Sequence, residues 1–420
     1  MKFFLIFLLC QLSCHARDYS PELAEKTFLY VWNKVNDSFY EETFNGVDWD
    51  QIKKTYENRV KKAKSNKELR TILNEMLSEL KLSHFGISKK PNSDDVKFSL
   101  SGNHLGIEIR LIDQKVVIFE VEDKSAAKRA GLKPGMILTS FEGEPMTQLI
   151  DELELTPNST RLNRLTATRS LLEKLSTPPD GKTTLQTANS KKTFDFKPGF
   201  YRGERGRMGN ETDLAVSFET SLVGKDQKVR LIAFDMFLPQ LMLRLNKAIA
   251  QAESEQASGL IFDLRGNPGG LGIMATGLIG RLIDKDLDLG DMNNTAGNYP
   301  FHAFPQEGAY LGPVAVLIDS FSASTSEIFA AALQEHQRAR IFGRPTTAAV
   351  LPSYIEELPN GDKFQYAIGD FVTALKKTKL EGKGVIPDEV ITLDPALLRA
   401  GSDPDLQAAL NWLNKQTTHK

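Results

Sequence analysis

From residue 229 onward, segments with the pattern of buried β-strands alternate with segments typical of α-helices. The strand-like segments are VRLIAFDMF, GLIFDLRG and PVAVLID, and the helix-like ones are MLRLNKAIAQAESE, MATGLIGRLI and SEIFAAALQEH. This alternation favours an α/β layer with a largely parallel sheet, because parallel strands need a crossover connection, usually a helix. No self-similarity recurs at a fixed period, which excludes a solenoid or propeller. The sequence therefore predicts an α/β core over residues 229–395.

The segments before and after this core have different patterns. Residues 20–95 read as a helical domain, with Asp48 and Ser65 as candidate N-caps followed three residues later by Gln51 and Glu68. Residues 100–150 combine short β-like runs with a short helix ending at Gly131 and a Pro-Gly turn, which indicates a separate β module. We expect a connecting β region and a C-terminal helix or tail in the remaining two segments, 151–228 and 396–420.

The first 16 residues, MKFFLIFLLCQLSCHA, join one lysine to a short apolar stretch. This pattern is typical of an export signal, and the stretch is too short for a stable membrane anchor. We expect residues 1–16 to be a signal peptide and the product to be periplasmic, in the cell envelope or secreted. A buried N-terminal helix is the alternative. A membrane partner is expected only if a lipid is attached at Cys14, which is a poor match to a lipidation site.

Composition excludes several classes of function. The 420 residues include 52 basic and 54 acidic side chains, so the near-zero net charge gives no field to attract nucleic acid. Cys10 and Cys14 are the two cysteines and both lie in the predicted signal, so the mature chain has no disulfide and no thiol nucleophile. There is no HExxH motif and no histidine pair. We therefore expect no metal and no cofactor.

The segment DSFSASTSEIFAAALQ, residues 319–334, follows a predicted strand and opens a predicted helix. Its serines Ser322, Ser324 and Ser326 stand where open α/β sheets place their ligands, at the carboxyl end of a strand. One of them is a candidate nucleophile. The other interpretation is a helix cap, because Ser324 with Glu327 also matches a capping box.

A serine nucleophile needs a base, usually a histidine held by a third group. The chain has six histidines, and His84 in LKLSHFGI lies just past a strongly predicted helix, next to Ser83. On its own, such a histidine is more often a helix C-cap. Any of three acids in TKLEGKGVIPDEVITL could orient it, and nothing local selects among Glu381, Asp388 and Glu389.

The segment GLIFDLRGNPGGLGIMATG ends a predicted strand in a glycine-rich turn that leads into a helix. Backbone N–H groups in such a turn can converge on an anion. The turn lacks the Lys-Ser/Thr of a P-loop and the spacing of a dinucleotide fingerprint. An oxyanion hole fits it better, with glycines needed only for close packing as the alternative.

In this order, the motifs resemble the C-terminal processing, or tail-specific, family of serine peptidases, family S41, over residues 25–395. The glycine turn, the serine segment, EGKGVIPDEV and the module HLGIEIRL…SAAKRAGLKPGMIL carry the resemblance. It implies that Ser324 is the nucleophile and that the N–H groups of Gly270 and Thr325 form the oxyanion hole. It also implies a ClpP/crotonase-like α/β catalytic core, so the expected fold class is multidomain α/β: a helical bundle, a PDZ-like β domain and this core.

One position departs from the pattern of many members. Where they carry a catalytic lysine in GEPTxGKG, this chain reads GRPTTAAV and has Ala349. The chain instead resembles the tricorn-core-like branch, whose Ser/His/Glu catalysis maps onto Ser324, His84 and Glu381, with Ser83 in a supporting position. The resemblance thus implies a serine-type peptidase acting as an endopeptidase on proteins or peptides. The alternative is a non-catalytic pseudopeptidase that binds peptides or lipids.

The segment HLGI at 104–107 is similar to the carboxylate-binding loop of PDZ domains. The resemblance implies that Leu105, Gly106 and Ile107 bind the C-terminus of a peptide, which adds to the sheet as an extra strand. We expect weak capture of apolar C-terminal tails or gating of the active site by this domain. A packing module without a ligand is the alternative.

Overall fold

In this computed structural model the described residues are 19–89, 105–156, 159–176, 183–188, 190–196, 204–208 and 211–417. The predicted signal peptide and His104 lie outside them. The chain divides into two compact units. The first comprises Met1–Lys81, Phe85–Asp95 and Ile355–Tyr366, and the second comprises Leu82–His84, Val96–Tyr354 and Ala367–Lys420.

The first unit is mainly helical. Both predicted caps are confirmed: the Asp48 carboxylate accepts the N–H of Gln51 at 2.9 Å, and the Ser65 hydroxyl oxygen accepts the N–H of Glu68 at 3.1 Å. A three-stranded sheet in the order β1-β18-β17 accompanies the helices, and two of its strands come from late in the chain. The elements of this unit are α1 (Pro21–Ser38), η1 (Phe44–Gly46), α2 (Trp49–Val60), α3 (Asn66–Ser78), β1 (Gly86–Ser88), β17 (Ser353–Glu357) and β18 (Lys363–Ala367).

The second unit begins with a small sheet in the order β2-β3-β4-β6-β7, packed against short helices around its own apolar core. The predicted short helix is present, and Gly131 ends it with φ 96°. The sheet continues beyond residue 150, and a helix of 16 residues occupies part of the region expected to be a β connection. The elements are β2 (Ile107–Ile112), β3 (Lys115–Val121), α4 (Ala126–Ala130), β4 (Ile137–Phe141), β5 (Glu144–Pro145), α5 (Met146–Asp151), α6 (Arg161–Ser176), β6 (Thr183–Thr187) and β7 (Ser190–Phe196).

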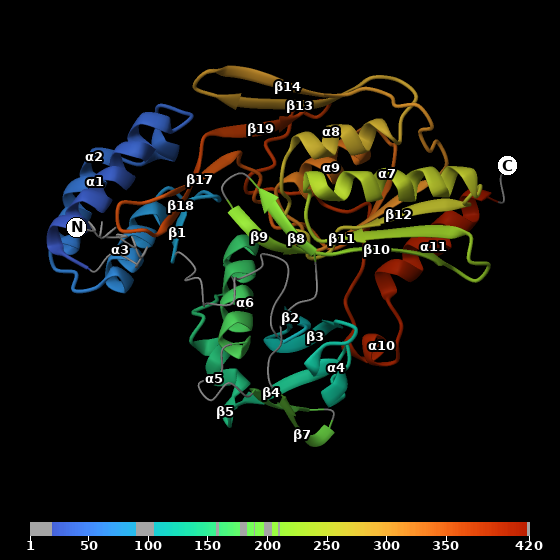
Figure 1. Ribbon diagram of the computed structural model, residues 1–420, viewed down its shortest axis with the longest axis horizontal. Helices are drawn as coiled ribbons and strands as arrows, with labels where there is room; N and C mark the ends of the chain where they lie inside the picture. Colours follow the sequence, from blue (N-terminus) through green and yellow to red (C-terminus); the bar gives the residue numbers. More distant parts are fainter. Residues whose placement is uncertain are drawn as a thin grey trace, which may run out of the picture. The chain divides into compact units, whose positions relative to one another are not determined.

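The large sheet of this unit has the strand order β10-β11-β12-β15-β16-β20 (Figure 1). All its neighbouring strands are parallel except the β10–β11 pair, as the alternating pattern predicts. Its strands are β10 (Phe218–Val223), β11 (Val229–Phe234), β12 (Gly259–Asp263), β15 (Val314–Ile318), β16 (Arg340–Gly343) and β20 (Glu389–Val390).

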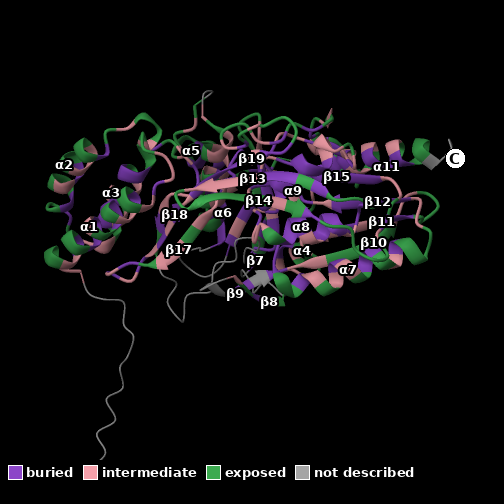
Figure 2. Ribbon diagram, turned by 90° about the horizontal axis from the view of Figure 1, so that it is seen from above, coloured by how far each residue is buried: buried purple, intermediate pink, exposed green. Residues whose placement is uncertain are grey.

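Helices cover both faces of this sheet. On one face α7 (Pro239–Ser254), α8 (Ile273–Gly280) and α9 (Thr325–Glu335) share the main apolar core with the strands (Figure 1). On the other face α11 (Pro404–Thr417) packs Ala409, Leu410 and Leu413 against a second cluster. Strand β15 is buried at every position, which explains its uninterrupted apolar sequence (Figure 2).

The remaining elements lie beside this layered core or form a small hairpin. Of the helices that the structure describes, none is long and apolar enough to span a bilayer. These elements are β8 (Glu204–Met208) paired with β9 (Glu211–Val216), the sheet of β13 (Leu287–Asn294), β14 (Gly297–Ala303) and β19 (Gly369–Thr373), and α10 (Pro395–Arg399).

The pairing of β12 with β15 positions the functional motifs. The two strands are parallel neighbours, with Asp263 opposite Leu317. Because the carboxyl ends of parallel strands meet at one edge of a sheet, the glycine turn after β12 and the serine segment after β15 start side by side. Two motifs that are more than 50 residues apart in the sequence are thus adjacent.

Candidate active site

The three serines of the serine segment have different environments. The Ser322 hydroxyl donates to the Leu264 carbonyl at 2.7 Å and accepts the N–H of Asp319 at 3.0 Å. The Ser326 hydroxyl lies 3.0 Å from two oxygens of Asn267. Both side chains are fully buried. Ser324 is only partly buried, so it is the serine that a substrate could reach.

Ser324 also has an unusual backbone conformation, with φ 53° and ψ −120°. A non-glycine residue in this region is strained, and such strain concentrates at functional sites because the surrounding structure must enforce it. A sharp, strained turn between a strand and a helix is how a nucleophilic serine is exposed in α/β-hydrolases. Ser324 occupies this kind of turn, between β15 and the start of α9.

The glycine turn packs directly against Ser324. A methyl group on Gly269 would lie 2.7 Å from Ser324 Cβ, and one on Gly270 would lie 2.3 Å from the Phe237 carbonyl oxygen. Both glycines have positive φ, so the turn needs them for conformation as well as for space. The Thr325 hydroxyl donates to the Gly270 carbonyl at 2.8 Å and ties the two turns together.

The N–H groups of Gly270 and Thr325 are available to bind an anion. In the described part of the chain, neither donates to a protein acceptor. The flanking groups are used: Phe237 donates to the Gly269 carbonyl at 2.7 Å, and Leu271 donates to the Phe237 carbonyl at 3.0 Å. Two free donors beside a partly exposed serine are the parts that an oxyanion hole requires.

Ser83 connects the predicted base with the predicted acid. Glu381 accepts the Ser83 N–H at 2.7 Å and the Ser83 hydroxyl at 2.8 Å. The Ser83 hydroxyl oxygen also lies 2.6 Å from His84 Nδ1. His84 itself has φ 60°, a second strained residue at the site. Glu381 therefore reaches the imidazole through Ser83, which the resemblance placed in a supporting position.

The hydrogen bonds assign the tautomer of His84. An ionised Glu381 only accepts, so the single Ser83 hydroxyl proton points to it. The Ser83 oxygen must then accept from His84 Nδ1–H, which leaves Nε2 unprotonated and able to take a proton. Burial lowers the pKa of His84 to about 4, although the residue as a whole is half-buried. Burial also raises the pKa of Glu381, while hydrogen bonds from Val350 and Ser83 act to lower it.

A short segment links the two halves of the site. The Ala349 carbonyl accepts the Ser324 N–H at 2.8 Å, and the next residue, Val350, donates its N–H to Glu381 at 2.9 Å. Ala349 stands where many S41 members carry lysine, and it is buried. No hydrogen bond joins Ser324 to His84 among the described residues. Such a hydrogen bond often forms only when substrate is bound, so its absence is compatible with His84 acting as the base for Ser324.

The other candidate groups have other partners. His336 binds the Asp288 carbonyl through Nε2 at 2.6 Å, and His302 lies exposed on β14. Asp388 accepts from Gln334 and from the Ile341 N–H, and Glu389 pairs with Arg340. Among the three acids that the sequence left open, Glu381 is the one that contacts Ser83.

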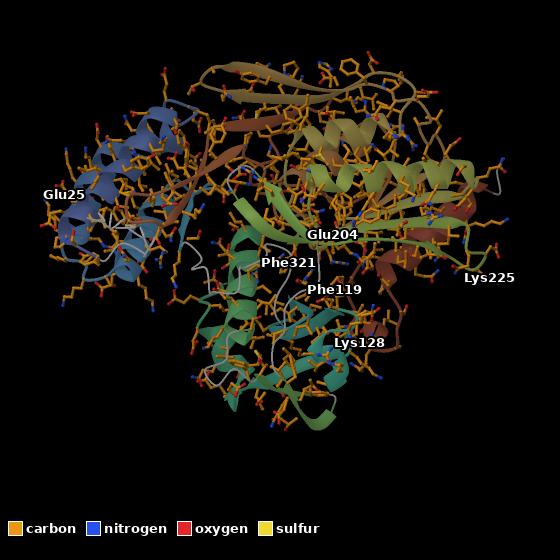
Figure 3. The ribbon with its side chains drawn as sticks, in the orientation of Figure 1. Glu25, Phe119, Lys128, Glu204, Lys225 and Phe321 are labelled. Carbon is orange, nitrogen blue, oxygen red and sulfur yellow. The ribbon has the colours of Figure 1, made fainter. Side chains whose placement is uncertain are left out.

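A buried ion pair at the start of the serine segment was not predicted from the sequence. Asp319 accepts the N–H groups of Gly266 and Phe321 and forms a buried ion pair with Arg110 at 2.7 Å. The Arg110 guanidinium also lies 4.0 Å from the ring of Phe321 and 4.5 Å from that of Phe119, both labelled in Figure 3. Arg110 belongs to β2 and Asp319 follows β15, so this pair connects the small sheet to the catalytic turns.

The predicted peptide-binding loop lies at the start of the small sheet. Leu105 and Ile107 are buried, and the Gly106 carbonyl accepts the N–H of Glu122 at 2.9 Å. Among the described strands, β2 stands at the end of this sheet, next to β3. An edge strand can accept an added strand, as the expected binding mode requires.

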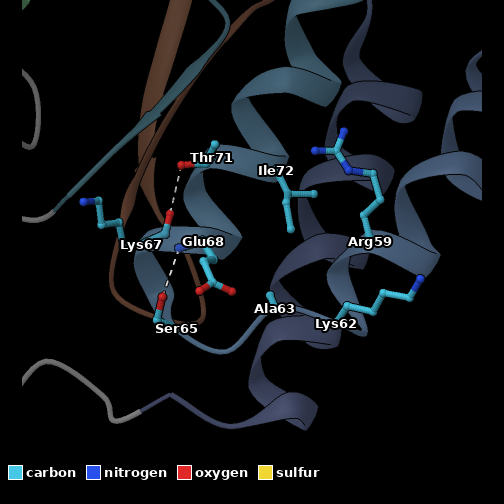
Figure 4. A pocket seen from close by; sticks show the side chains of 8 residues that line it. All are labelled: Arg59, Lys62, Ala63, Ser65, Lys67, Glu68, Thr71 and Ile72. Carbon is cyan, nitrogen blue, oxygen red and sulfur yellow. Dashed lines mark hydrogen bonds between the residues drawn. The ribbon is translucent and has the colours of Figure 1, made fainter.

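No cluster of histidine, cysteine, aspartate or glutamate suited to a metal ion occurs among the described residues. A surface hollow of about 520 Å³ lies in the helical unit, and none of the predicted catalytic side chains lines it (Figure 4). It is lined mainly by the end of α2 and the start of α3, and several of its side chains are charged. It holds neither a nucleophile–base pair nor a buried polar group that points to a ligand.

Comparison with known proteins matches two parts of the chain to family models. Residues 229–391 match the peptidase family S41, and residues 22–78 match the tricorn protease C1 domain. A carboxyl-terminal-processing protease of Synechocystis is 27% identical over 398 residues, which cover 93% of this chain and 86% of that protein. The carboxy-terminal processing protease CtpB of Bacillus subtilis is 29% identical over 72% of this chain and 60% of its own length.

Solved structures show the same fold. A photosystem II D1 C-terminal processing protease aligns with a TM-score of 0.57 at 20% identity, covering 93% of this chain and 97% of its own. Mature CPAF aligns with a TM-score of 0.63 at 15% identity, covering 94% and 96%. The matched family, the relatives and the shared architecture agree with one another. The chain therefore contains a peptidase family S41 domain over residues 229–391 and is a serine-type peptidase related to the carboxyl-terminal-processing proteases.

Proposed function

We propose that this chain is an exported serine endopeptidase in which Ser324 is the nucleophile, His84 the general base and Glu381 the acid that holds the base. The observation that carries the proposal is the chain of contacts from Glu381 through Ser83 to His84, which the segment 348–350 connects to the strained Ser324. Each member suits its role: His84 has a free Nε2, Glu381 a half-buried carboxylate with hydrogen-bond donors, and Ser324 a partly exposed hydroxyl.

The mechanism follows the logic of a serine triad. Ser324 Oγ attacks the scissile carbonyl carbon while His84 Nε2 takes its proton, and the imidazolium then protonates the leaving amine. As the imidazole becomes cationic, its Nδ1–H bond to Ser83 strengthens, and Ser83 passes this polarisation to Glu381. Water attacks the acyl-enzyme in a second cycle with the same proton transfers.

The Gly270 and Thr325 N–H groups stabilise the oxyanion of the tetrahedral intermediate. They are fixed before the substrate arrives, because each belongs to a turn that is anchored on both sides. A single such donor contributes about 2.7–4 kcal/mol in a well-studied protease. A pseudopeptidase needs neither the free donors nor the strained serine, so these features favour the enzyme.

Hydrolysis of a fluorescently labelled unfolded protein such as casein tests this function. The wild-type chain should release soluble fragments, and both Ser324→Ala and His84→Ala should stop their release. Ser322→Ala is a poor control because that hydroxyl is buried in the turn, whereas exposed Ser88 offers a matched serine that should be dispensable. Wild-type cleavage that persists in Ser324→Ala would point to another nucleophile.

The small sheet serves in this proposal as a PDZ-like recognition module. An extended peptide would add as a strand beside β2, and the loop at Leu105, Gly106 and Ile107 would receive its C-terminal carboxylate. Support comes from the edge position of β2 and from Gly106, whose φ of 68° directs the loop. The named relatives process carboxyl-terminal segments, and recognition of a free C-terminus suits that reaction.

We propose export because the first 16 residues are mainly apolar, as in a signal peptide. Determination of the N-terminal residue of the mature protein, isolated from cells that express the full sequence, tests it. Cleavage after Ala16 is expected. A product that retains Met1 in the cytosolic fraction would contradict export.

A further inference from the structure

A buried carboxylate that the proposed proton transfers do not use lies next to the nucleophile. Glu327 is 0% exposed and belongs to the first turn of α9. Its Oε2 accepts the N–H groups of Ser324 and Ala349, each at 3.0 Å. Its Oε1 accepts the Ala348 N–H at 3.0 Å and the Thr346 hydroxyl.

These four bonds exceed what a helix cap needs. A capping glutamate ordinarily binds only the N–H of the N-cap residue, here Ser324. Glu327 binds in addition three donors from the segment 346–349, which continues into Val350 and so to Glu381. One carboxylate thus fixes the nucleophile relative to the segment that carries the rest of the site.

We propose that Glu327 is a positioning residue: its ionised carboxylate holds Ser324 in the strained conformation, and protonation of Glu327 weakens this hold and slows the reaction of Ser324. The inference rests on the proposed function of Ser324. A residue at φ 53° keeps this conformation only if its surroundings enforce it, and the bond to the Ser324 N–H acts directly on that backbone. Bonds to an ionised carboxylate are about twice as strong as neutral ones.

Protonation changes this arrangement in a defined way. The four acceptor positions are all occupied, so an added proton must displace a donor. The Thr346 hydroxyl can rotate and accept instead, whereas a peptide N–H cannot. The N–H groups of Ser324, Ala348 and Ala349 then donate to a neutral carboxylic acid, which is a weaker acceptor than a carboxylate. Burial raises the pKa of Glu327 to about 7 against the hydrogen bonds that lower it. Because the ionised form is the active one, the rate should be lost as the pH falls through about 7.

Other charged groups near Glu327 must be separated from it. A methyl group on Gly384 would lie 3.0 Å from Glu327 Oε1 and 3.1 Å from the Arg161 guanidinium, so Arg161 of α6 faces the same space. Lys383 lies next to Gly384 in the chain. Glu381 and His84 lie beyond Val350; the pKa of Glu381 is raised and that of His84 is lowered to about 4. The Thr346 hydroxyl donates to Glu327 and accepts the Val385 N–H at 2.7 Å, so Thr346→Val removes a neutral donor of Glu327 and leaves every charged group in the chain.

The experiment measures the rate of Ser324 labelling by a fluorophosphonate from about pH 5 to pH 9 on the full chain. For the wild type we expect the rate to fall about tenfold per pH unit below the midpoint. The Thr346 hydroxyl lowers the pKa of Glu327, so Thr346→Val should move the midpoint to higher pH. Thr347→Val is the matched control, because this neighbouring buried hydroxyl donates to the Ser320 carbonyl at 2.8 Å. Glu327→Gln should react slowly and without this pH dependence.

An unchanged midpoint in Thr346→Val, or a retained acid limb in folded Glu327→Gln, would overturn the role of Glu327. Folding of each variant is checked by its thermal unfolding midpoint. The outcome for the proposed function is separate: wild-type labelling that is absent in Ser324→Ala supports it whatever the midpoints. A folded wild type that is unlabelled at every pH contradicts the proposed function and the positioning role together.

Discussion

At the scale of single residues, the three serines of one motif differ in burial and backbone conformation rather than in chemistry. Ser322 and Ser326 use their hydroxyls to join the serine segment to the glycine turn. Ser324 keeps a partly exposed side chain on a strained backbone. The sequence could place one of the three as nucleophile only through resemblance, because alternating serines before a helix also suit capping.

Alanine substitution should separate these roles. Ser326→Ala removes the hydroxyl donor shared by two Asn267 oxygens, each of which keeps a backbone N–H donor, so we expect the free energy of unfolding to fall by about 0.5–1.5 kcal/mol. Ser324→Ala should abolish labelling. Intact mass measures labelling, and denaturant unfolding measures the stability of both variants. Labelling that persists in Ser324→Ala would contradict the assignment.

The acid of the site should matter for turnover more than for binding. Glu381→Gln keeps the size of the side chain but offers an amide where two Ser83 groups donate, so the tautomer of His84 is no longer fixed. We expect kcat to fall on the order of 10²–10⁴-fold with KM nearly unchanged. Steady-state kinetics on a peptide substrate measures both. An unaltered kcat would remove Glu381 from the mechanism.

The contact between Ser83 and Glu381 could not be predicted from the sequence. Its position beside His84 was evident in the sequence, and its contact with an acid almost 300 residues away was not. Local patterns report spacing along one element, whereas this contact depends on how distant segments pack. The same limit applies to Glu327, which local spacing could identify only as a cap.

At the scale of elements, a buried ion pair between Arg110 of β2 and Asp319 connects this strand to the turn after β15. Burial alone would raise the pKa of Asp319, but Arg110, Arg344 and the Gly266 N–H outweigh it and lower the pKa to about 2. Asp319 therefore contributes stability above its unfolded pKa, and this contribution is lost as the pH falls toward 2.

Removing this carboxylate should destabilise the second unit strongly. Asp319→Asn removes the nearer of the two carboxylates that pair with buried Arg110, at 2.7 Å against 3.5 Å for Glu108, and we expect a loss of at most about 3–5 kcal/mol in the free energy of unfolding. Glu57→Gln, which breaks an exposed pair with Lys61, is the control and should have no measurable effect. Denaturant unfolding near neutral pH compares them. A neutral Asp319→Asn would show that the pair does not hold the elements together.

The elements themselves were predictable where their patterns were strong. Strands β11, β12 and β15, helices α7, α8 and α9 and both helix caps of the first unit were expected, because their apolar periodicity and capping residues are local signals. Strands β13, β14 and β16 were not predicted. Helix α6 was not predicted either, since its apolar residues do not form one continuous stripe along the helix. The pairing of β6 and β7 with the small sheet likewise leaves no local signal.

At the scale of the whole molecule, the chain order does not match the division into compact units. Residues 355–366 of the expected core belong to the first unit, and Leu82–His84 of the expected helical domain belong to the second. The catalytic histidine of the proposal thus lies in the unit that contains the serine. The sequence indicated the number and type of modules, but their exchange of segments depends on long-range packing.

The proposed PDZ-like role of the small sheet predicts a substrate preference. A peptide substrate with a free C-terminal carboxylate should have a lower KM than the same peptide with a C-terminal amide, because a charged carboxylate accepts hydrogen bonds more strongly than a neutral amide. The value of kcat should be similar for both. Cleavage assays with the two peptides measure the difference, and equal KM values would contradict tail capture.

The most direct test of the whole account is the intact mass of the protein after incubation with a fluorophosphonate. The account predicts one adduct on the wild type, located on Ser324, and none on either Ser324→Ala or His84→Ala. An adduct that persists in Ser324→Ala, or a well-folded wild type that gains no mass, would contradict the claim that Ser324 is a nucleophile activated by His84.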